Sequence, residues 1–207
     1  INPFIWNEEM RNDSLELFGI EEGDRVLDVG CGTGFATEGL LERTENVYGL
    51  DQSEHQLEKA YEKFGKRDQV RFHRGDAERL PFADDAFDAL WSSGSIEYWP
   101  NPVDALEEFR RVVKPGGPVL VVGPNYPRSG VFRKLADAIM LFYDEAEADR
   151  MFREAGYGEF RHVTMGPDYN PEIAITTIAR VPGGADEAPG ATAAEIVDAP
   201  ADASADD

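Results

Sequence analysis

The chain has 207 residues and a formal net charge of −21 at pH 7, from 41 acidic and 20 basic side chains. Its length suits one α/β domain with a buried core, and its charge would repel nucleic-acid phosphates, so we expect no nucleic-acid partner. The single cysteine, Cys31, excludes an internal disulfide and is typical of a reducing compartment, so we expect a cytoplasmic protein.

The first part of the sequence alternates short apolar runs with helical patterns, which predicts a parallel sheet. Residues 1–24 are predicted to form an N-terminal cap with a short helix over Glu8–Phe18, which covers the core, a ligand or both. The strands that follow are predicted at Arg25–Val29, Asn46–Leu50, Val70–Arg74, Phe87–Trp91 and Val119–Val122. Helices are predicted over Phe35–Arg43, from a capping box at Ser53–Gln56 to Gly65, and from Asn101-Pro102 to Pro115.

The alternation is interrupted after the fifth strand. Residues 124–143 are predicted to be a lid-like insertion, in which residues 128–143 combine an apolar helical face with a local basic cluster. Two interpretations of this segment stay open: a helix of the core, or an amphipathic lid that touches a lipid surface or an apolar substrate.

The rest of the chain completes the domain. A capping box at Asp144–Glu147 begins a helix that ends at Gly156. Alternating strands at Glu159–Met165 and Glu172–Val181 form a hairpin, which makes the last strand antiparallel. Residues 183–207 are rich in Ala, Asp and Glu and contain no base, so we expect a disordered acidic tail.

A glycine-rich loop, Gly30-Cys31-Gly32-Thr33-Gly34, follows the first strand. Glycines let the backbone turn sharply and let a ligand approach closely, and a strand-to-helix turn presents free N–H groups. The third glycine comes one residue earlier than in the G-x-G-x-x-G of dinucleotide sites, and a carboxylate at Asp28 would crowd a pyrophosphate. Because that carboxylate suits a cationic ligand, the loop favours S-adenosylmethionine over NAD.

Further polar residues stand where the next strands end. Asp51, followed by Gln52, ends the second strand, where a carboxylate can accept hydrogen bonds from both hydroxyls of a ribose. Asp76 and Ala77 follow the third strand, where the aspartate can accept a hydrogen bond from an adenine amino group. Ser93 begins the loop after the fourth strand. All of these positions lie at the carboxyl edge of the sheet, where open α/β folds bind ligands.

This order of elements and strand-end residues resembles the class I S-adenosylmethionine-dependent methyltransferases, as does Arg-Val-Val-Lys-Pro-Gly-Gly at residues 111–117. A closer likeness, over roughly residues 1–167, is to the 2-methyl-6-phytyl (or solanesyl)-1,4-benzoquinol methyltransferases of plastoquinone and tocopherol synthesis. It rests on Asn2-Pro3 with Trp6 and Glu9-Met10-Arg11, Leu50-Asp51-Gln52-Ser53 with His55-Gln56-Leu57, Gly94 to Pro100, Gly123-Pro124 with Tyr126-Pro127, and Ala136-Asp137 with Met140-Leu141-Phe142.

The resemblance implies a Rossmann-like, seven-stranded sheet with an antiparallel last strand and helices on both faces, over residues 1–182. It implies S-adenosylmethionine as cofactor and no metal. The cofactor-binding residues are then Asp28, Gly30, Cys31, Gly32, Gly34, Asp51, Gln52, Asp76, Ala77 and Ser93. The implied reaction is methyl transfer to the carbon ortho to a quinol hydroxyl, which needs a proton acceptor. Glu97, Tyr98 and Tyr126 are the candidates because they lie on loops at the ligand edge.

Two other functions fit the same residues: methylation of an oxygen or nitrogen of a small soluble molecule, and binding of S-adenosylmethionine without turnover. The aromatic N-terminal segment and the apolar insertion favour a prenylated quinol instead. Plant members of the family carry a membrane anchor where this chain has acidic residues, and the composition indicates a prokaryote. We therefore expect a menaquinol- or benzoquinol-type ring, and peripheral membrane contact through residues 128–143.

Acidic residues are spread along the whole chain and lysine is scarce beside arginine, which favours adaptation to a salt-rich cytoplasm over an ordinary acidic protein with an acidic tail. Salt screens the self-repulsion of such a chain. We predict that the free energy of unfolding in urea rises from low to molar potassium chloride. Equal stability at both salt concentrations would contradict the adaptation.

Overall fold

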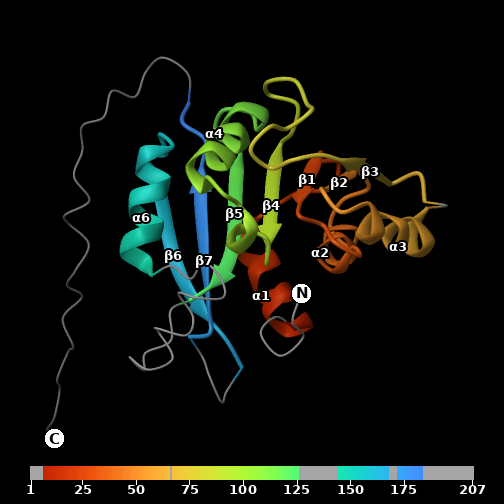
Figure 1. Ribbon diagram of the computed structural model, residues 1–207, viewed down its shortest axis with the longest axis horizontal. Helices are drawn as coiled ribbons and strands as arrows, with labels where there is room; N and C mark the ends of the chain where they lie inside the picture. The colour runs from red at the N-terminus through yellow and green to blue at the C-terminus, as the bar shows by residue number, and fades with distance from the viewer. Residues whose placement is uncertain (1–6, 66, 126–143, 168–171, 184–207) are drawn as a thin grey trace, which may run out of the picture.

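The computed structural model describes residues 7–65, 67–125, 144–167 and 172–183. They form one seven-stranded sheet in the order β3-β2-β1-β4-β5-β7-β6 (Figure 1). The strands are β1 (Val26–Val29), β2 (Val47–Asp51), β3 (Val70–Arg74), β4 (Ala89–Ser93), β5 (Pro118–Pro124), β6 (Glu159–Met165) and β7 (Ala174–Arg180). Strands β1 to β5 are parallel, whereas β7 is antiparallel to β5 and to β6, which confirms the predicted mixed sheet.

Helices cover both faces of the sheet (Figure 1). They are α1 (Glu8–Phe18), α2 (Phe35–Leu40), α3 (Glu54–Phe64), the 3₁₀ helix η1 (Ile96–Tyr98), α4 (Pro102–Val112) and α6 (Glu145–Glu154). The helices α1, α2 and α3 bury apolar side chains against one face, and α4 and α6 bury theirs against the other. The sheet therefore separates two apolar layers.

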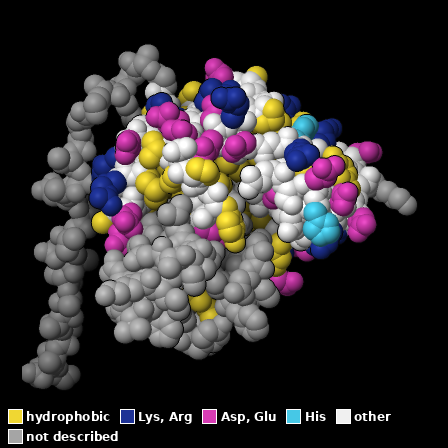
Figure 2. Space-filling model, in the orientation of Figure 1, with side chains coloured by type: hydrophobic (Ala, Val, Ile, Leu, Met, Phe, Trp, Pro, Cys, Tyr) yellow, Lys and Arg dark blue, Asp and Glu magenta, His cyan; other side chains and the backbone are white. Residues whose placement is uncertain are grey.

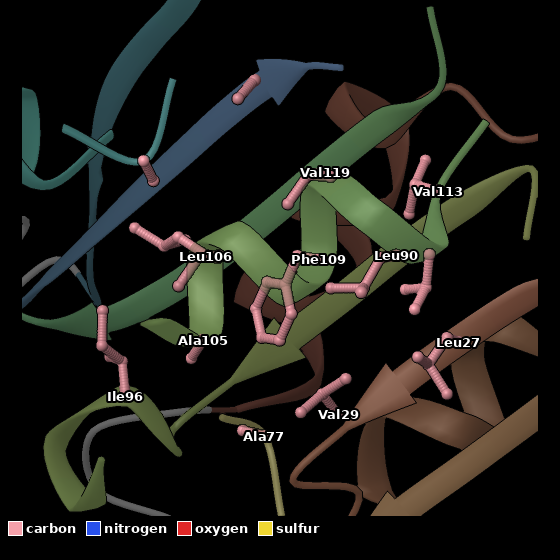
Figure 3. Packing of buried hydrophobic residues seen from close by; sticks show 14 of the residues in the cluster. Leu27, Val29, Ala77, Leu90, Ile96, Ala105, Leu106, Phe109, Val113 and Val119 are labelled. Atoms are coloured by element: carbon pink, nitrogen blue, oxygen red, sulfur yellow. The ribbon is translucent and has the colours of Figure 1, made fainter. Parts of the chain in front are cut away.

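Each central strand contributes to both layers because successive side chains of a strand point to opposite faces. In β1, Leu27 belongs to the layer under α4 and α6, whereas Val26 belongs to the layer under α1 to α3. Figure 3 shows the first layer, where Phe109 of α4 lies among side chains from the sheet that include Leu90 and Val119. All of these side chains are fully buried.

The order of the strands reverses at the centre of the sheet. From β1 the chain continues outward on one side to β2 and β3, then returns to β4 on the other side of β1. The loop after β1 leads into α2 on one face, and the loop after β4 leads toward α4 on the opposite face. Divergent loops of this kind open a crevice at the carboxyl ends of the two strands.

Turn and cap chemistry explains where most helices begin. The side chains of Asn7 and Ser53 accept hydrogen bonds from the third helical N–H of α1 and of α3. Asp144 and Glu147 form the predicted reciprocal capping box at the start of α6. At α4 the predicted start is confirmed, with Asn101 as the N-cap residue and Pro102 first in the helix, although the side chain of Asn101 makes no capping bond within its own helix.

Several predicted boundaries were wrong by one to three residues, among them those of β4 and α2. The fourth strand begins at Ala89, because Phe87 forms only an isolated bridge with Val113. The helix after the glycine loop ends at Leu40 instead of Arg43. Residues 41–43 continue as turns, and the hydroxyl of Thr44 donates to the carbonyl of Asp24 at 2.6 Å, which ties this segment to the start of β1.

Several predictions fall outside the described residues: the first part of the N-terminal cap, the lid from residue 126 onward with Tyr126, and the acidic tail beyond residue 183.

No helix in the described ranges is long and apolar enough to cross a membrane. Within the same ranges, no group of His, Cys, Asp and Glu side chains is arranged to hold a metal ion. Figure 2 shows acidic side chains spread over the described part of the face that is turned toward the viewer.

Gly34, which precedes α2, has a φ of 86°, and a Cβ added there would lie 2.4 Å from the ring of the buried Phe64. We predict that Gly34→Ala lowers the free energy of unfolding by about 3 kcal/mol, from backbone strain and overpacking. Gly23→Ala is the matched control, since its φ is also positive but nothing lies within 4 Å of the added Cβ. Denaturation should give a loss of about 1 kcal/mol for this control. Equal losses of stability in Gly34→Ala and Gly23→Ala would mean that the Phe64 ring moves aside at no cost in free energy.

Candidate functional site

The loops after β1, β2, β3 and β4 meet around a cavity of about 740 Å³, a size typical of small-molecule sites. Residues from the start of α2 and from α3 complete its wall. The predicted site residues that line the cavity are Gly30, Gly32, Asp51, Gln52, Asp76, Ala77 and Tyr98. The structure therefore brings together residues from four separate strand ends.

The other predicted site residues in the described ranges do not line this cavity. Cys31 and Ser93 are each 2% exposed, and Ser93 accepts a hydrogen bond from the indole of Trp91. Burial raises the pKa of the Cys31 thiol, which fits a packing role. Asp28 is buried, and Glu97 directly precedes Tyr98, which lines the cavity. Gly34 lies against Phe64, and Tyr126 is outside the described residues.

Asp51 organises the glycine loop. One carboxylate oxygen accepts the Gly32 N–H and the other accepts the Ser53 N–H, each at 2.8 Å. The carbonyl of Leu50 accepts the N–H groups of Gly30 and of its neighbour in the same loop, at 2.8 and 3.0 Å. A carboxylate oxygen has more than one acceptor site, so Asp51 can still accept hydroxyl groups of a ligand.

Two serines that the sequence analysis missed connect the loop after β4 to the end of β1. The Ser92 hydroxyl donates to the carbonyl of Val29 at 2.9 Å and lies 2.7 Å from the hydroxyl of Ser95. Ser95 lines the cavity, and a Cβ on Gly30 would lie 2.4 Å from the Cβ of Ser95. The loops after β1 and β4 therefore touch, and glycine is required at the contact. In the sequence, the only indication of this contact was the cluster of small residues after β4.

Asp28 lies beneath the glycine loop and is 1% exposed. Its carboxylate accepts a hydrogen bond from the Thr37 hydroxyl of α2 at 2.6 Å. Burial raises the pKa of Asp28 from 3.8 to about 7; the Thr37 hydrogen bond opposes this rise and the charge of Asp51 adds to it. Asp28 is therefore a carboxyl group that titrates near neutral pH, and positive charge above it would favour its ionised form.

The loop after β4 combines an aromatic wall with a partly buried carboxylate. Tyr98 is 63% exposed and Trp99 is 6% exposed, and both line the cavity. The ring of Trp99 packs edge-to-face on Phe109 of α4, with ring centroids 5.3 Å apart. Glu97 has a buried Oε2 atom with no hydrogen-bond partner among the described residues, and burial raises its pKa. A carboxylate in this state is suited to accept a proton.

The loop after β3 is tied to the start of α4. Asp76, which lines the cavity, accepts the N–H of Glu78 at 3.0 Å. The carboxylate of Glu78 then accepts both the backbone N–H and the side-chain amide of Asn101, at 2.6 and 3.1 Å. This Glu78–Asn101 contact joins two walls of the cavity. Nothing in the local sequence pattern predicted it, because its partners are far apart in the chain.

The hydrogen-bond acceptors that line the cavity fit a nucleoside ligand that carries positive charge. Carboxylates stand at the ends of β2 and β3, and residues 27–121, which contain these loops, match the family described as "Methyltransferase domain". Residues 27–121 therefore belong to a methyltransferase domain. The methyltransferase domain thus includes the glycine loop, Asp51, Asp76 and the loop after β4.

Similar proteins support this assignment. The chain is 45% identical over 172 residues to 2-methyl-6-phytyl-1,4-hydroquinone methyltransferase 2, chloroplastic, of Oryza sativa subsp. japonica, over 82% of this chain and 49% of that protein. It is 35% identical over 134 residues to demethylmenaquinone methyltransferase of Staphylococcus aureus (strain JH9), over 63% of this chain and 54% of that protein. The chain therefore spans about half the length of these curated relatives, and the predicted family resemblance is confirmed.

A solved structure shows the same fold. The complex between the Haloferax volcanii Trm112 methyltransferase activator and the putative methyltransferase contains a chain that matches with a TM-score of 0.70 and 26% identity. The match covers 84% of this chain and 89% of that chain. The Rossmann-like class of the methyltransferase domain is thereby confirmed.

Because the pKa of Asp28 is higher in the folded than in the unfolded chain, its stabilising contribution is present below pH 4 and is lost as the pH rises through about 7. We predict that Asp28→Asn, which keeps an acceptor for Thr37, removes this pH dependence. Without cofactor, the variant should be more stable than the wild type by roughly 2–4 kcal/mol at pH 8 and similar to it at low pH.

Urea denaturation between low pH and pH 8 at constant salt measures this difference. Asp13→Asn, at an exposed position of α1, is the control and should follow the wild type. A difference between Asp28→Asn and the wild type that stays constant with pH would contradict the assignment.

Proposed function

We propose that the chain transfers a methyl group from S-adenosylmethionine to a ring carbon of a prenylated quinol, of menaquinol or benzoquinol type, in isoprenoid quinone biosynthesis. The observation that carries this proposal is Glu97, whose buried Oε2 atom has no hydrogen-bond partner among the described residues, next to the aromatic cavity wall at Tyr98. The names of the relatives, which refer to a phytyl hydroquinone and to demethylmenaquinone, support the same ring chemistry.

The cavity offers partners for each part of the cofactor. Asp51 accepts the ribose hydroxyls at the acceptor sites that its backbone contacts leave free. Asp76 accepts the adenine amino group, and Ala77 and Gln52 lie beside these two carboxylates on the cavity wall. The negative charges of Asp28 and Asp51 favour a sulfonium and an ammonium group. When bound, the cofactor supplies the methyl group as an electrophile.

The residues of the loop after β4 prepare the quinol as the nucleophile. Glu97 accepts the proton of a ring hydroxyl, which moves electron density onto the neighbouring ring carbon. Burial raises the pKa of Glu97, which makes its carboxylate a stronger base than an exposed one. Tyr98 and Trp99 would hold the flat ring against the cavity wall, within reach of the cofactor's methyl group. For each methyl group that the ring carbon would gain from the bound cofactor, that carbon would release one proton to solvent, and Glu97 would return its proton to the ring oxygen.

We also propose that the protein works in a salt-rich cytoplasm and touches the membrane surface through residues 128–143. The apolar face and the basic cluster in the sequence of this segment suit an interface with lipid head groups. An apolar prenyl tail would keep the substrate at that surface. Because residues 126–143 lie outside the described ranges, this part of the proposal rests on the sequence.

The test is methyl transfer from labelled S-adenosylmethionine to reduced demethylmenaquinone and to reduced 2-methyl-6-phytylbenzoquinone, followed by lipid extraction. We predict a label on the ring carbon of at least one lipid product. Glu97→Gln should lower kcat by about 100-fold or more, as for a lost general base, and should leave the affinity for S-adenosylmethionine within about twofold. Glu107→Gln, on the exposed side of α4, is the matched control and should retain full activity.

Label found only on an oxygen or nitrogen of a water-soluble compound would contradict the quinol proposal and favour the small-molecule alternative. Binding of the cofactor without any transfer would favour a non-catalytic binding module. Full activity of Glu97→Gln would remove Glu97 as the base and leave Tyr98 and Tyr126 as the candidate acceptors.

A further inference from the structure

Arg11 of α1 is a buried cation close to the cofactor cavity. Its side chain is 5% exposed, although it carries a permanent positive charge. Its guanidinium donates to the carbonyl of Phe35 at 3.2 Å and to the side chain of Asn12 at 3.1 Å. Both acceptors are neutral. A buried charge with neutral partners alone is costly, so the position of Arg11 calls for a negative group nearby.

The described residues supply only a weak counter-charge. The nearest carboxylate oxygen, of Glu38, lies 3.9 Å from Arg11, and the Glu38 side chain is 44% exposed. The same carboxylate oxygen lies 3.0 Å from the ammonium group of Lys63. Arg11, Glu38 and Lys63 together carry a net positive charge. Within the described ranges, the buried guanidinium is therefore not fully neutralised.

This positive charge lies directly behind the cavity wall. The guanidinium carbon of Arg11 is 5.0 Å from the ring centre of Phe35, and Phe35 lines the cavity. On the other side, α2 has a glycine at Gly39, where a Cβ would lie 2.8 Å from the Arg11 side chain. Arg11 thus fits against α2 because Gly39 has no side chain. The ring of Phe35 separates its guanidinium from the cavity.

We infer that Arg11 is the counter-charge for the carboxylate of the methionine part of S-adenosylmethionine, and so determines the preference for a ligand that has this group. The inference rests on the proposed cofactor site. Asp28, Asp51 and Asp76 favour the cationic groups of the cofactor but repel its carboxylate. A cation that compensates this repulsion is therefore needed, and Arg11 offers one at the side of the cavity formed by Phe35.

Lys59 is the competing candidate, because it also lines the cavity. Its position on α3 is exposed, so water and salt screen its charge. Arg11 is enclosed by α1, α2 and Phe35, where the effective dielectric constant is lower and a charge acts over a longer distance. These surroundings favour Arg11, above all in a medium of high salt.

Calorimetry with two ligands tests the inference without measuring activity. S-adenosylmethionine and decarboxylated S-adenosylmethionine differ only in the carboxylate. We expect Arg11→Met to lower the affinity for S-adenosylmethionine about tenfold and the affinity for the decarboxylated ligand less than about twofold. Arg11→Lys, which keeps the charge, should retain most of the preference. The ratio of the two affinities within one variant does not depend on the fraction of folded protein.

Arg43→Met is the matched control. Arg43 also connects the α2 region to α1, through Glu16, but it lies on the exposed side away from the cavity lining, so both affinities should stay unchanged. Equal losses for both ligands in Arg11→Met would show a merely structural role and overturn the inference. A lost preference in Lys59→Met instead would assign the carboxylate to Lys59. If the wild type binds neither ligand, the proposed cofactor site itself fails.

Discussion

The ligand edge of this protein depends on the carboxylate of Asp51. Because its two oxygens accept N–H groups from Gly32 and Ser53, one side chain at the end of β2 anchors both the glycine loop and the start of α3. The carbonyl of Leu50, one residue earlier, holds the first turn of the same loop. The loop is thus shaped by contacts within the protein. A ligand then meets a preorganised site and does not have to order it.

Opposite charges are buried on two sides of this loop. Asp28 lies beneath it, bound to Thr37, and Arg11 lies behind Phe35. Such a pair would orient a ligand that has an ammonium and a carboxylate on one carbon. In the reversed orientation the ammonium would lie near Arg11 and the carboxylate near Asp28, and both contacts would be repulsive. The many surface carboxylates of the chain act differently, since salt screens them while the buried groups keep their effect.

The sequence predicted the sheet and most of the cavity, because parallel strands end at one edge and short strands are recognisable by their apolar runs. Asp51 and Asp76 were found in this way. The position of Asp28 below the loop follows from side-chain alternation, since Leu27 and Val29 face the α4 layer and Asp28 must face the α2 side. The contacts of Ser92 and Glu78 could not be predicted, because they join segments whose spacing only the folded chain defines.

The Glu78–Asn101 contact gives the cavity a mechanical property. The first turn of α4 has no cap of its own, and its N-cap residue is held by a carboxylate from the loop after β3. That loop and the start of the helix are thus coupled. A change in the length of the loop between β3 and β4 is therefore expected to affect the start of α4 and the adjoining cavity wall together, while the residues at the ends of β1 and β2 stay the same.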